Sequence, residues 1–289
     1  MNIHSPSLIE ESMKGADTVI YFSHDYFSLV QDKNEQLLFA SKVAKEYNIE
    51  KFIAIAPIEF INYQVPQISS DPVKELNETL AKVQEIHPNT VVVRPDLVFG
   101  SNSYFIKFLM QSWCQSFSYY NSSNYPQLKF SPIYWNDMNV AIQTLIENDF
   151  ENFKGKKYFL SGKETLQFSD IDNLIKQAYH EESNFTSPND VLRKINESYR
   201  LFFHGNNHII NFGKMLNFLN GKEYNEGYED LSASIDLKSK LKSFREYYSE
   251  KSMQKGKHLE EDMKSRFTSV ESDHLTYPEY SKYWHISLN

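Results

Sequence analysis

Residues 18–56 read TVIYFSHDYFSLVQDKNEQLLFASKVAKEYNIEKFIAIA. The segments 18–22 and 52–56 are short, apolar and rich in β-branched and aromatic residues, which is typical of buried strands. Between them, Leu38, Phe39, Val43, Ala44 and Tyr47 recur at helical spacing, which predicts an amphipathic helix over 35–47. This stretch therefore predicts one strand–helix–strand unit.

The pattern continues on both sides of this unit. A short helix is expected over 7–15, a helix beginning at Pro72 behind an Asp71 cap, and a third strand over 91–93. Short apolar strands that alternate with amphipathic helices indicate an α/β fold, with a parallel sheet and helices on both faces. In such sheets ligands bind beyond the carboxyl ends of the strands. The loops to inspect are therefore 22–25, 56–59 and 94–100.

After Ser101 the alternation weakens. A strand is expected over 129–135, a helix over 140–147, a strand over 158–160 and a helix over 168–179, and the chain becomes charged and mainly helical after Gly221. We expect three regions: a truncated Rossmann-like domain (1–130), a smaller α-rich region that completes the fold (131–248), and an extended aromatic C-terminal tail (249–289) that docks on partners.

Composition excludes several classes of protein. The chain has 289 residues with 30 Lys+Arg against 38 Asp+Glu, a net charge of −8, so a nucleic-acid partner is not expected. Cys114 is the only cysteine, so no intrachain disulfide or thiolate metal cluster can form. No apolar stretch is long enough to span a membrane. The first residues show no readable targeting signal.

Glycine is scarce, with only 9 in the chain, and no G-x-G-x-x-G turn occurs. A dinucleotide site needs such a turn so that the backbone can approach the pyrophosphate. The predicted sheet therefore looks as though it begins in the middle of a Rossmann fold.

Several segments resemble the extended short-chain dehydrogenases. These are Lys14 to Tyr21, Glu50 to Ile53, Val93 to Gly100, Pro132 to Met138 and Gly227 to Leu231. Their order is similar to that in the dehydrogenase-like accessory subunits of the alpha subcomplex of mitochondrial respiratory complex I, and the match at 227–231 separates this subfamily from its relatives. The resemblance covers most of residues 1–245.

This resemblance implies what the site lacks. The superfamily's catalytic Tyr and Lys fall on Pro72 and Leu76, neither of which transfers a proton. Full-length members bind NADPH as a structural ligand. This chain alone is expected to hold no cofactor, and NADPH is expected only if a second chain supplies the glycine-rich half. The residues that would then contact it are Phe22, Ser23, Pro57, Pro95 and Leu97.

The other reactive side chains have simple structural interpretations. His24-Asp25 is interpreted as a loop contact, Asp137 as a helix N-cap, Cys114 as a packed thiol, and His204 and His208 as loop residues rather than a metal pair, so no metal site is expected. Lys238, Lys240, Lys242 and Arg245 predict a solvated helix face that can also meet anionic lipid head groups.

Three functions follow. The first is a non-catalytic accessory subunit of complex I, bound to other subunits of the complex, peripheral on the matrix side of the mitochondrial inner membrane, where the peripheral arm meets the membrane. The second is an active extended short-chain reductase or epimerase whose N-terminal half lies on another chain. The third is a free-standing α/β protein that binds a partner through its aromatic tail.

Overall fold

The fold was analysed in a computed structural model. It describes residues 6–22, 30–58, 72–100, 122–147, 150–180 and 224–253, and six single residues: Ser103, Phe105, Ile106, Leu109, Leu216 and Leu219.

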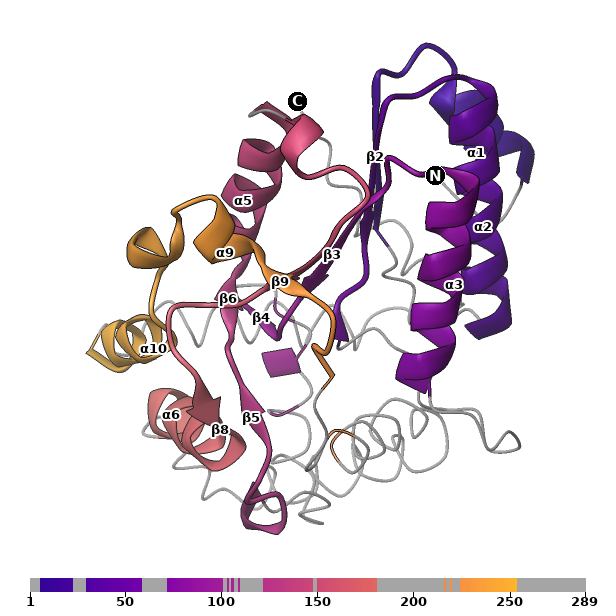
Figure 1. The fold of residues 1–289 in the computed structure, drawn as a ribbon. Helices are drawn as coiled ribbons and strands as arrows, with labels where there is room; N and C mark the ends of the chain where they lie inside the picture. The colour runs from indigo at the N-terminus through magenta and orange to yellow at the C-terminus, as the bar shows by residue number, and fades with distance from the viewer. Residues whose placement is uncertain are drawn as a thin grey trace, which may run out of the picture.

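The centre of the fold is a five-stranded parallel sheet in the order β1-β2-β3-β7-β9 (Figure 1). Its strands are β1 (Thr18–Phe22), β2 (Lys51–Ile55), β3 (Val91–Pro95), β7 (Lys157–Leu160) and β9 (Glu229–Asp230). Every residue of β3 is buried, whereas β1 lies at one end of this order and its residues are only partly buried or exposed. The fold class predicted from the sequence, α/β with a parallel sheet, is confirmed.

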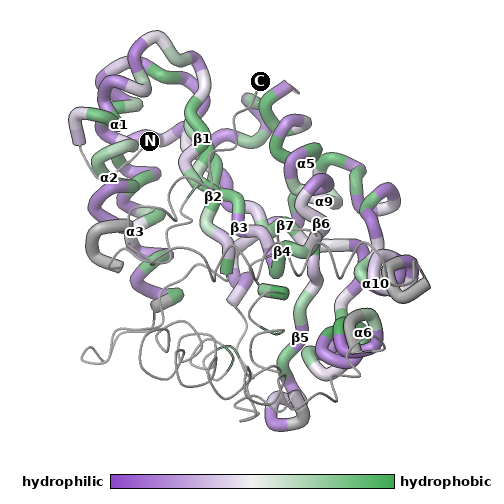
Figure 2. Tube along the Cα trace, turned by 180° about the vertical axis from the view of Figure 1, so that it is seen from behind, coloured by the Kyte–Doolittle hydropathy of each residue, from purple (hydrophilic) through white to green (hydrophobic). Residues whose placement is uncertain are grey.

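Three helices cover one face of the sheet: α1 (Pro6–Met13), α2 (Val30–Glu46) and α3 (Pro72–Ile86). Their apolar residues, such as Val43 and Leu80, pack against Phe52, Ala54 and Val92 of the strands. Figure 2 shows the central strands as mostly hydrophobic and these helices as alternating between hydrophobic and hydrophilic residues. This alternation is the amphipathic pattern from which the helices were predicted.

The opposite face is covered by α5 (Trp135–Glu147) and by the short helix α9 (Leu231–Ser234). Ala141 and Leu145 of α5 pack against strand residues that alternate with those of the first face, including Ile53, Val93 and Tyr158. Both faces of the sheet are therefore covered, as a parallel sheet requires.

A third apolar cluster lies beyond the carboxyl ends of the strands and contains α6 (Phe168–His180) and α10 (Phe244–Met253). Two small sheets accompany it, β4 (Val98–Phe99) with β6 (Ile133–Tyr134) and β5 (Lys129–Phe130) with β8 (Leu166–Gln167). The remaining elements are the 3₁₀ turns η2 (Ser122–Asn124), η3 (Phe150–Asn152) and η4 (Lys238–Lys240).

Aromatic rings hold this third cluster together. Phe99 contacts the rings of Phe244, Tyr247 and Tyr248 at centroid distances of 5.0, 5.4 and 6.3 Å. These edge-on and tilted contacts fix α10 on the loop that follows β3.

The structure corrects several sequence predictions in the second half. The strand expected over 129–135 is two short strands, β5 and β6, and the helix expected to begin at 140 begins at Trp135. Asp137 is therefore not an N-cap: it lies inside the first turn of α5, and its carboxylate accepts a hydrogen bond from the Lys242 backbone N at 2.6 Å. The sequence after Gly221 also contributes a strand, β9, to the main sheet.

No helix among the described residues is long and apolar enough to cross a membrane.

Candidate functional site

The parallel strands end along one edge of the sheet, where the sequence places a ligand site. The chain continues past β2 and β3 in register, since Ala56 N donates to Val93 O at 2.9 Å and Asp96 N donates to Leu160 O at 3.1 Å. The segments 55–58, 95–97 and 160–162 therefore lie together at this edge.

The residues predicted to contact a nicotinamide cofactor lie at this edge but are largely enclosed by protein. Pro57, Pro95 and Leu97 are buried, and Leu97 packs in the third apolar cluster. Phe22 is partly buried against the α5 face, and Ser23 lies outside the described residues. A dinucleotide needs accessible contact surface, so the burial of these three side chains does not fit NADPH held against them. Their role as contacts stays a prediction.

The two positions on which the resemblance places the superfamily's catalytic pair lie on α3. Pro72 is the first residue of the helix, and Leu76 is partly buried between two apolar clusters. A pyrrolidine ring and an isobutyl group have no proton to exchange and no charge to stabilise a phenolate. Leu76 contributes packing to both clusters, and the absence of acid–base chemistry from this turn of helix stays a prediction.

Beside Leu76, a polar cluster joins α3 to β3 and to the segment before β9. Arg94 is fully buried and donates to Asn77 Oδ1 at 2.7 Å and to Tyr224 O at 2.8 Å. Its guanidinium lies 4.3 Å from the centroid of the Tyr228 ring, and the Tyr228 hydroxyl donates to Asn77 Oδ1 at 3.1 Å. Hydrogen bonds and a cation–π contact thus offset the cost of burying the charge.

Burial raises the pKa of the Tyr228 phenol, and the neighbouring Arg94 cation opposes this effect. Tyr228 therefore stays a neutral donor to Asn77 at physiological pH. The sequence pointed to the Arg94 segment through its motif, but the partners on α3 and at 224–228 lie 17 or more positions away and carry no local signal.

Asp96 directly follows β3 and is a buried carboxylate. It accepts hydrogen bonds from Leu97 N at 2.7 Å and from Ser131 N at 2.5 Å. Burial raises the pKa of Asp96 to about 6, against the lowering effect of these two hydrogen bonds. These hydrogen bonds fix the loop after β3 to the turn before β6. This is a structural role that requires no contact with a substrate.

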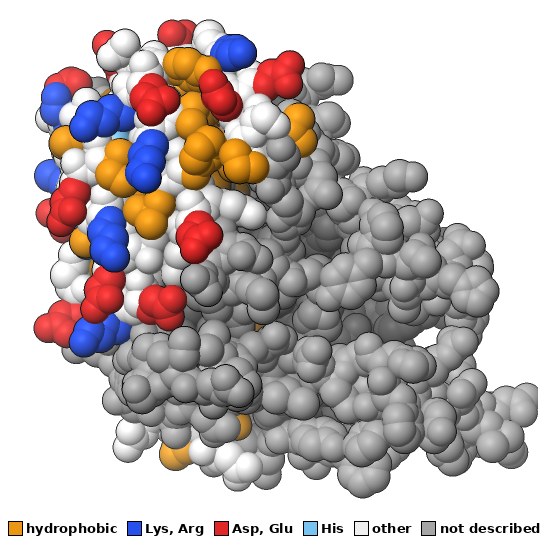
Figure 3. Space-filling model, turned by 90° about the vertical axis from the view of Figure 1, so that its right-hand side faces the viewer, with side chains coloured by type: hydrophobic (Ala, Val, Ile, Leu, Met, Phe, Trp, Pro, Cys, Tyr) orange, Lys and Arg blue, Asp and Glu red, His pale blue; other side chains and the backbone are white. Residues whose placement is uncertain are grey.

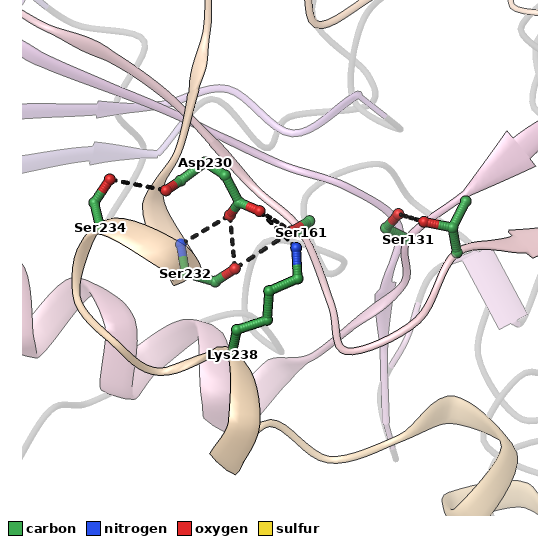
Figure 4. Close-up of polar contacts among 7 residues, drawn as sticks. Ser131, Ser161, Asp230, Ser232, Ser234 and Lys238 are labelled. Carbon is green, nitrogen blue, oxygen red and sulfur yellow. Dashed lines mark hydrogen bonds and ion pairs between the residues drawn. The ribbon is translucent and has the colours of Figure 1, made fainter.

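A second carboxylate, Asp230, organises the end of β9 (Figure 4). It caps α9 through Ser232 N at 3.0 Å and accepts hydrogen bonds from Ser161 Oγ at 2.9 Å and from Lys238 Nζ at 2.8 Å. Burial acts to raise the pKa of Asp230, but the hydrogen bonds from Lys238, Ser232 and Ser161 outweigh it and hold the pKa below its ordinary value. Asp230 lies in the segment 227–231 that carries the resemblance, but its contacts with Ser161 and Lys238 have no local signal in the sequence.

The cations predicted to form a solvated or lipid-facing surface are mostly paired within the chain. Lys238 pairs with Asp230, Lys242 with Glu250, and Arg245 with Glu164 and Asp170. Lys242 also lies 5.3 Å from the centroid of the Tyr247 ring. These pairs lower the positive charge available to an anionic surface.

Among the described residues, no group of three or more His, Cys, Asp or Glu side chains is arranged to hold a metal ion. His24, Asp25, Cys114, His204 and His208 lie outside the described part of the chain, as does the aromatic tail from 254 onward.

The fold and this edge define a class of protein. The chain has the Rossmann-like fold of NAD(P)-binding reductases and epimerases: it is similar to a nucleoside-diphosphate-sugar epimerase from Staphylococcus aureus (TM-score 0.54, 13% identity, 86% of this chain and 81% of that one). It is also similar to the Citrobacter sp. triphenylmethane reductase solved with NADP(H) (TM-score 0.52, 12% identity, 87% of this chain and 82% of that one). At these identities the similarity shows the fold alone.

In sequence, the chain is similar to the mitochondrial NADH dehydrogenase (ubiquinone) 1 alpha subcomplex subunit 9 of Dictyostelium discoideum, with 27% identity over 168 residues. The predicted resemblance to a dehydrogenase-like complex I subunit is thereby confirmed. The match covers 55% of this chain and 43% of that relative, less than half of its length. No protein-family model matches the chain.

Proposed function

We propose that the protein is a non-catalytic accessory subunit of mitochondrial NADH:ubiquinone oxidoreductase (complex I). The observation that carries this proposal is the sequence similarity to the Dictyostelium discoideum subunit of that complex. The resemblance supports the non-catalytic part, because it places Pro72 and Leu76, in the first turns of α3, where the superfamily has its proton donor and its lysine.

In this proposal the α/β body is a scaffold. Arg94, Asp96 and Asp230 are used to fix loops at the carboxyl edge of the sheet rather than to meet a substrate. The regions 1–130 and 131–248 form this scaffold, and the tail 249–289 docks on neighbouring subunits. The protein lies on the matrix side of the inner membrane, where it stabilises the junction of the peripheral and membrane arms.

The proposal also includes two further partners, a second protein chain and lipid head groups. A second chain that supplies the glycine-rich half would extend the sheet from β1. It would itself have to provide the contact surface for NADPH, because Pro57, Pro95 and Leu97 are buried. Lipid head groups are the weaker partner, because Lys238, Lys242 and Arg245 already pair with carboxylates.

The test is to tag the chain in its own cells, extract the mitochondria gently, and identify what migrates with it on native gels. We expect core subunits of complex I in constant proportion to the tagged chain, and less assembled complex when the chain is depleted. Migration without any respiratory subunit would overturn the accessory role.

The non-catalytic role is tested separately with the purified protein, assayed for oxidation of NADH and NADPH with carbonyl compounds and nucleotide sugars. We expect no turnover above the buffer background. Turnover that survives further purification would establish the alternative, an active extended short-chain reductase or epimerase.

A further inference from the structure

The outward face of α5 differs from those of α2 and α3, the long helices on the other face of the sheet. Its exposed residues are Trp135, Asn136, Asn139, Val140, Gln143 and Glu147. At 100° per residue the first five span an arc of about 140° on the helix, opposite the buried residues Met138, Ala141, Ile142 and Leu145. None of these five is charged. Glu147, in the last turn, falls within the same arc and accepts a hydrogen bond from Gln143 Nε2 at 2.7 Å.

The helices on the other face of the sheet show the usual solvated pattern. The exposed positions of α3 are Lys74, Glu78, Lys82 and Glu85, and those of α2 include Glu35, Lys42, Lys45 and Glu46. Figure 3 shows that side of the molecule, with Lys, Asp and Glu side chains spread around a group of hydrophobic ones. The uncharged face of α5 is therefore not shared by the helices on the other side of the sheet, although the exposed described residues of α6, Asn173 and Gln177, are also uncharged.

Large hydrophobic side chains are exposed at three described positions, and all three lie on the α5 side of the sheet. Trp135 is 41% and Val140 is 40% exposed, both on α5. Ile20, on β1, is 43% exposed and pairs in register with Ile53, whose side chain packs under α5. Exposed aromatic and aliphatic residues without charges are the composition of an interface centre.

Trp135 is also held in place before any partner arrives. Its ring packs edge-on against Tyr134, with centroids 6.1 Å apart, and its Cδ1 atom would lie 2.3 Å from a Cβ at Gly100. Gly100 has φ +140°, a conformation that favours glycine. A residue with a Cβ would also clash with the indole beside it. A rigid exposed ring loses little conformational entropy on binding, which is the property of an anchor residue.

We propose that the outer face of α5, centred on Trp135, Asn139 and Val140, is a docking surface for another protein chain, whose contacting side chains are apolar at the centre with amide or hydroxyl groups around them. A protein is the favoured occupant because lipid head groups and nucleic acids are held by cations. The arc itself carries none, and Lys242, whose Nζ lies 5.8 Å from the centroid of the neighbouring Tyr134 ring, pairs with Glu250. The identity of that chain as a complex I subunit rests on the proposed function, whereas the surface itself does not.

The test introduces one positive charge at the surface of the full-length tagged protein. Asn139→Lys and Val140→Lys place an ammonium in the uncharged face, and Asn173→Lys makes the same change as the first at an exposed position of α6. The fraction of each variant in the high-mass assembly is measured on native gels, and folding is checked by thermal denaturation of the purified proteins.

We expect Asn139→Lys and Val140→Lys to lower the assembled fraction about tenfold or more, because each buries an unpaired charge in the interface, and Asn173→Lys to leave it unchanged. Assembly of both α5 variants at the wild-type level would overturn the proposal. If Val140→Lys lowers the melting temperature, the assembled fraction of Asn139→Lys alone tests the proposal. The Asn139 side chain is solvent-exposed and packs in no core cluster.

The outcomes also separate this surface from the proposed function. A wild-type assembly that lacks respiratory subunits overturns the complex I role, while the same variants still decide the surface. A wild-type protein that is monomeric in the extract overturns both. Flotation of the wild type with anionic phospholipid vesicles, lost in Val140→Lys, would assign the face to a membrane and overturn a protein partner.

Discussion

Asp96 couples the stability of the fold to pH. Its pKa is about 6 in the folded protein, above the ordinary 3.8, so between these values the folded state holds a proton that the unfolded state has released. Stability is therefore lost as the pH rises from about 4 to about 6. The difference between these two pKa values corresponds to about 3 kcal/mol of stability lost by pH 7.

We expect Asp96→Asn to remove this dependence. In urea unfolding between pH 4 and pH 7, the free energy of unfolding of the wild type should fall relative to that of the variant by about 2.4 kcal/mol, because the unfolded carboxyl is already mostly ionised at pH 4. Groups shared by both proteins, such as Asp230, cancel in the difference. Parallel curves for the two proteins would show that Asp96 is ionised in the same range folded and unfolded.

An added Cβ would destabilise the protein at Gly162 by steric clash and at Gly227 by backbone strain. A Cβ at Gly162 would lie 1.7 Å from the Pro132 carbonyl oxygen, whereas at Gly227 it would meet nothing within 4 Å but the backbone has φ +80°. We expect Gly162→Ala to destabilise the protein by about 3 kcal/mol or more, because backbone must move, and Gly227→Ala by about 1 kcal/mol, because of left-handed strain alone. Chemical denaturation of both variants measures this difference. Equal losses of stability in the two variants would mean that the loop after β7 shifts at little energetic cost to accommodate the Cβ.

At the scale of the element, Asp230 determines how α9 follows β9. It caps the helix and receives hydrogen bonds from Ser161 and Lys238, which come from different parts of the chain. We expect Asp230→Ala to lower the free energy of unfolding by about 2–3 kcal/mol, through the lost cap and the partners left behind.

Ser234→Ala is the matched control, because the Ser234 hydroxyl is exposed and bonds only to the Asp230 carbonyl. We expect that variant to lie within about 0.5 kcal/mol of the wild type. A similar loss in both variants would mean that α9 as a whole, rather than the carboxylate, carries the effect.

The elements of the first hundred residues follow from their sequence because strand and helix patterns there are local. The strand over 18–22 has the predicted bounds, and the helix predicted to begin at Pro72 begins there and runs to Ile86. The start of α5 could not be predicted from local pattern: Trp135 and Asn136 favour a strand or a turn in isolation, and it is the docking of Met138 and Leu145 on the sheet that brings them into the helix. The interpretation of Asp137 as an N-cap was wrong for the same reason, because α5 begins two residues before it.

For the whole molecule, stability should vary from strand to strand. Every residue of β3 is buried between β2 and β7, whereas all residues of β1 are partly or largely exposed. In hydrogen-exchange mass spectrometry of the purified chain, we expect amides of 91–94 to exchange at least about tenfold more slowly than those of 18–22. Comparable protection of the two strands would contradict this order of stability.

The sequence predicts the fold class of the whole molecule but only the location of its candidate site. Alternating apolar segments specify a parallel sheet and hence the edge where its loops gather. The content of that edge depends on contacts over long separations, such as Asp96 with Ser131 and Arg94 with Tyr224, and no spacing rule encodes them. The uncharged face of α5 is visible in the sequence only once the true start of the helix is known.

The order of strands in the sheet has a consequence for biosynthesis. Strand β9 pairs with β7, although 68 residues separate Leu160 from Glu229 in the chain. On the ribosome, β1, β2, β3 and β7 can pair as they emerge, but the hydrogen-bonding edge of β7 stays open until residue 230 has been made. A nascent chain that stalls in this interval exposes an apolar strand edge, so it becomes a substrate for chaperones or for aggregation.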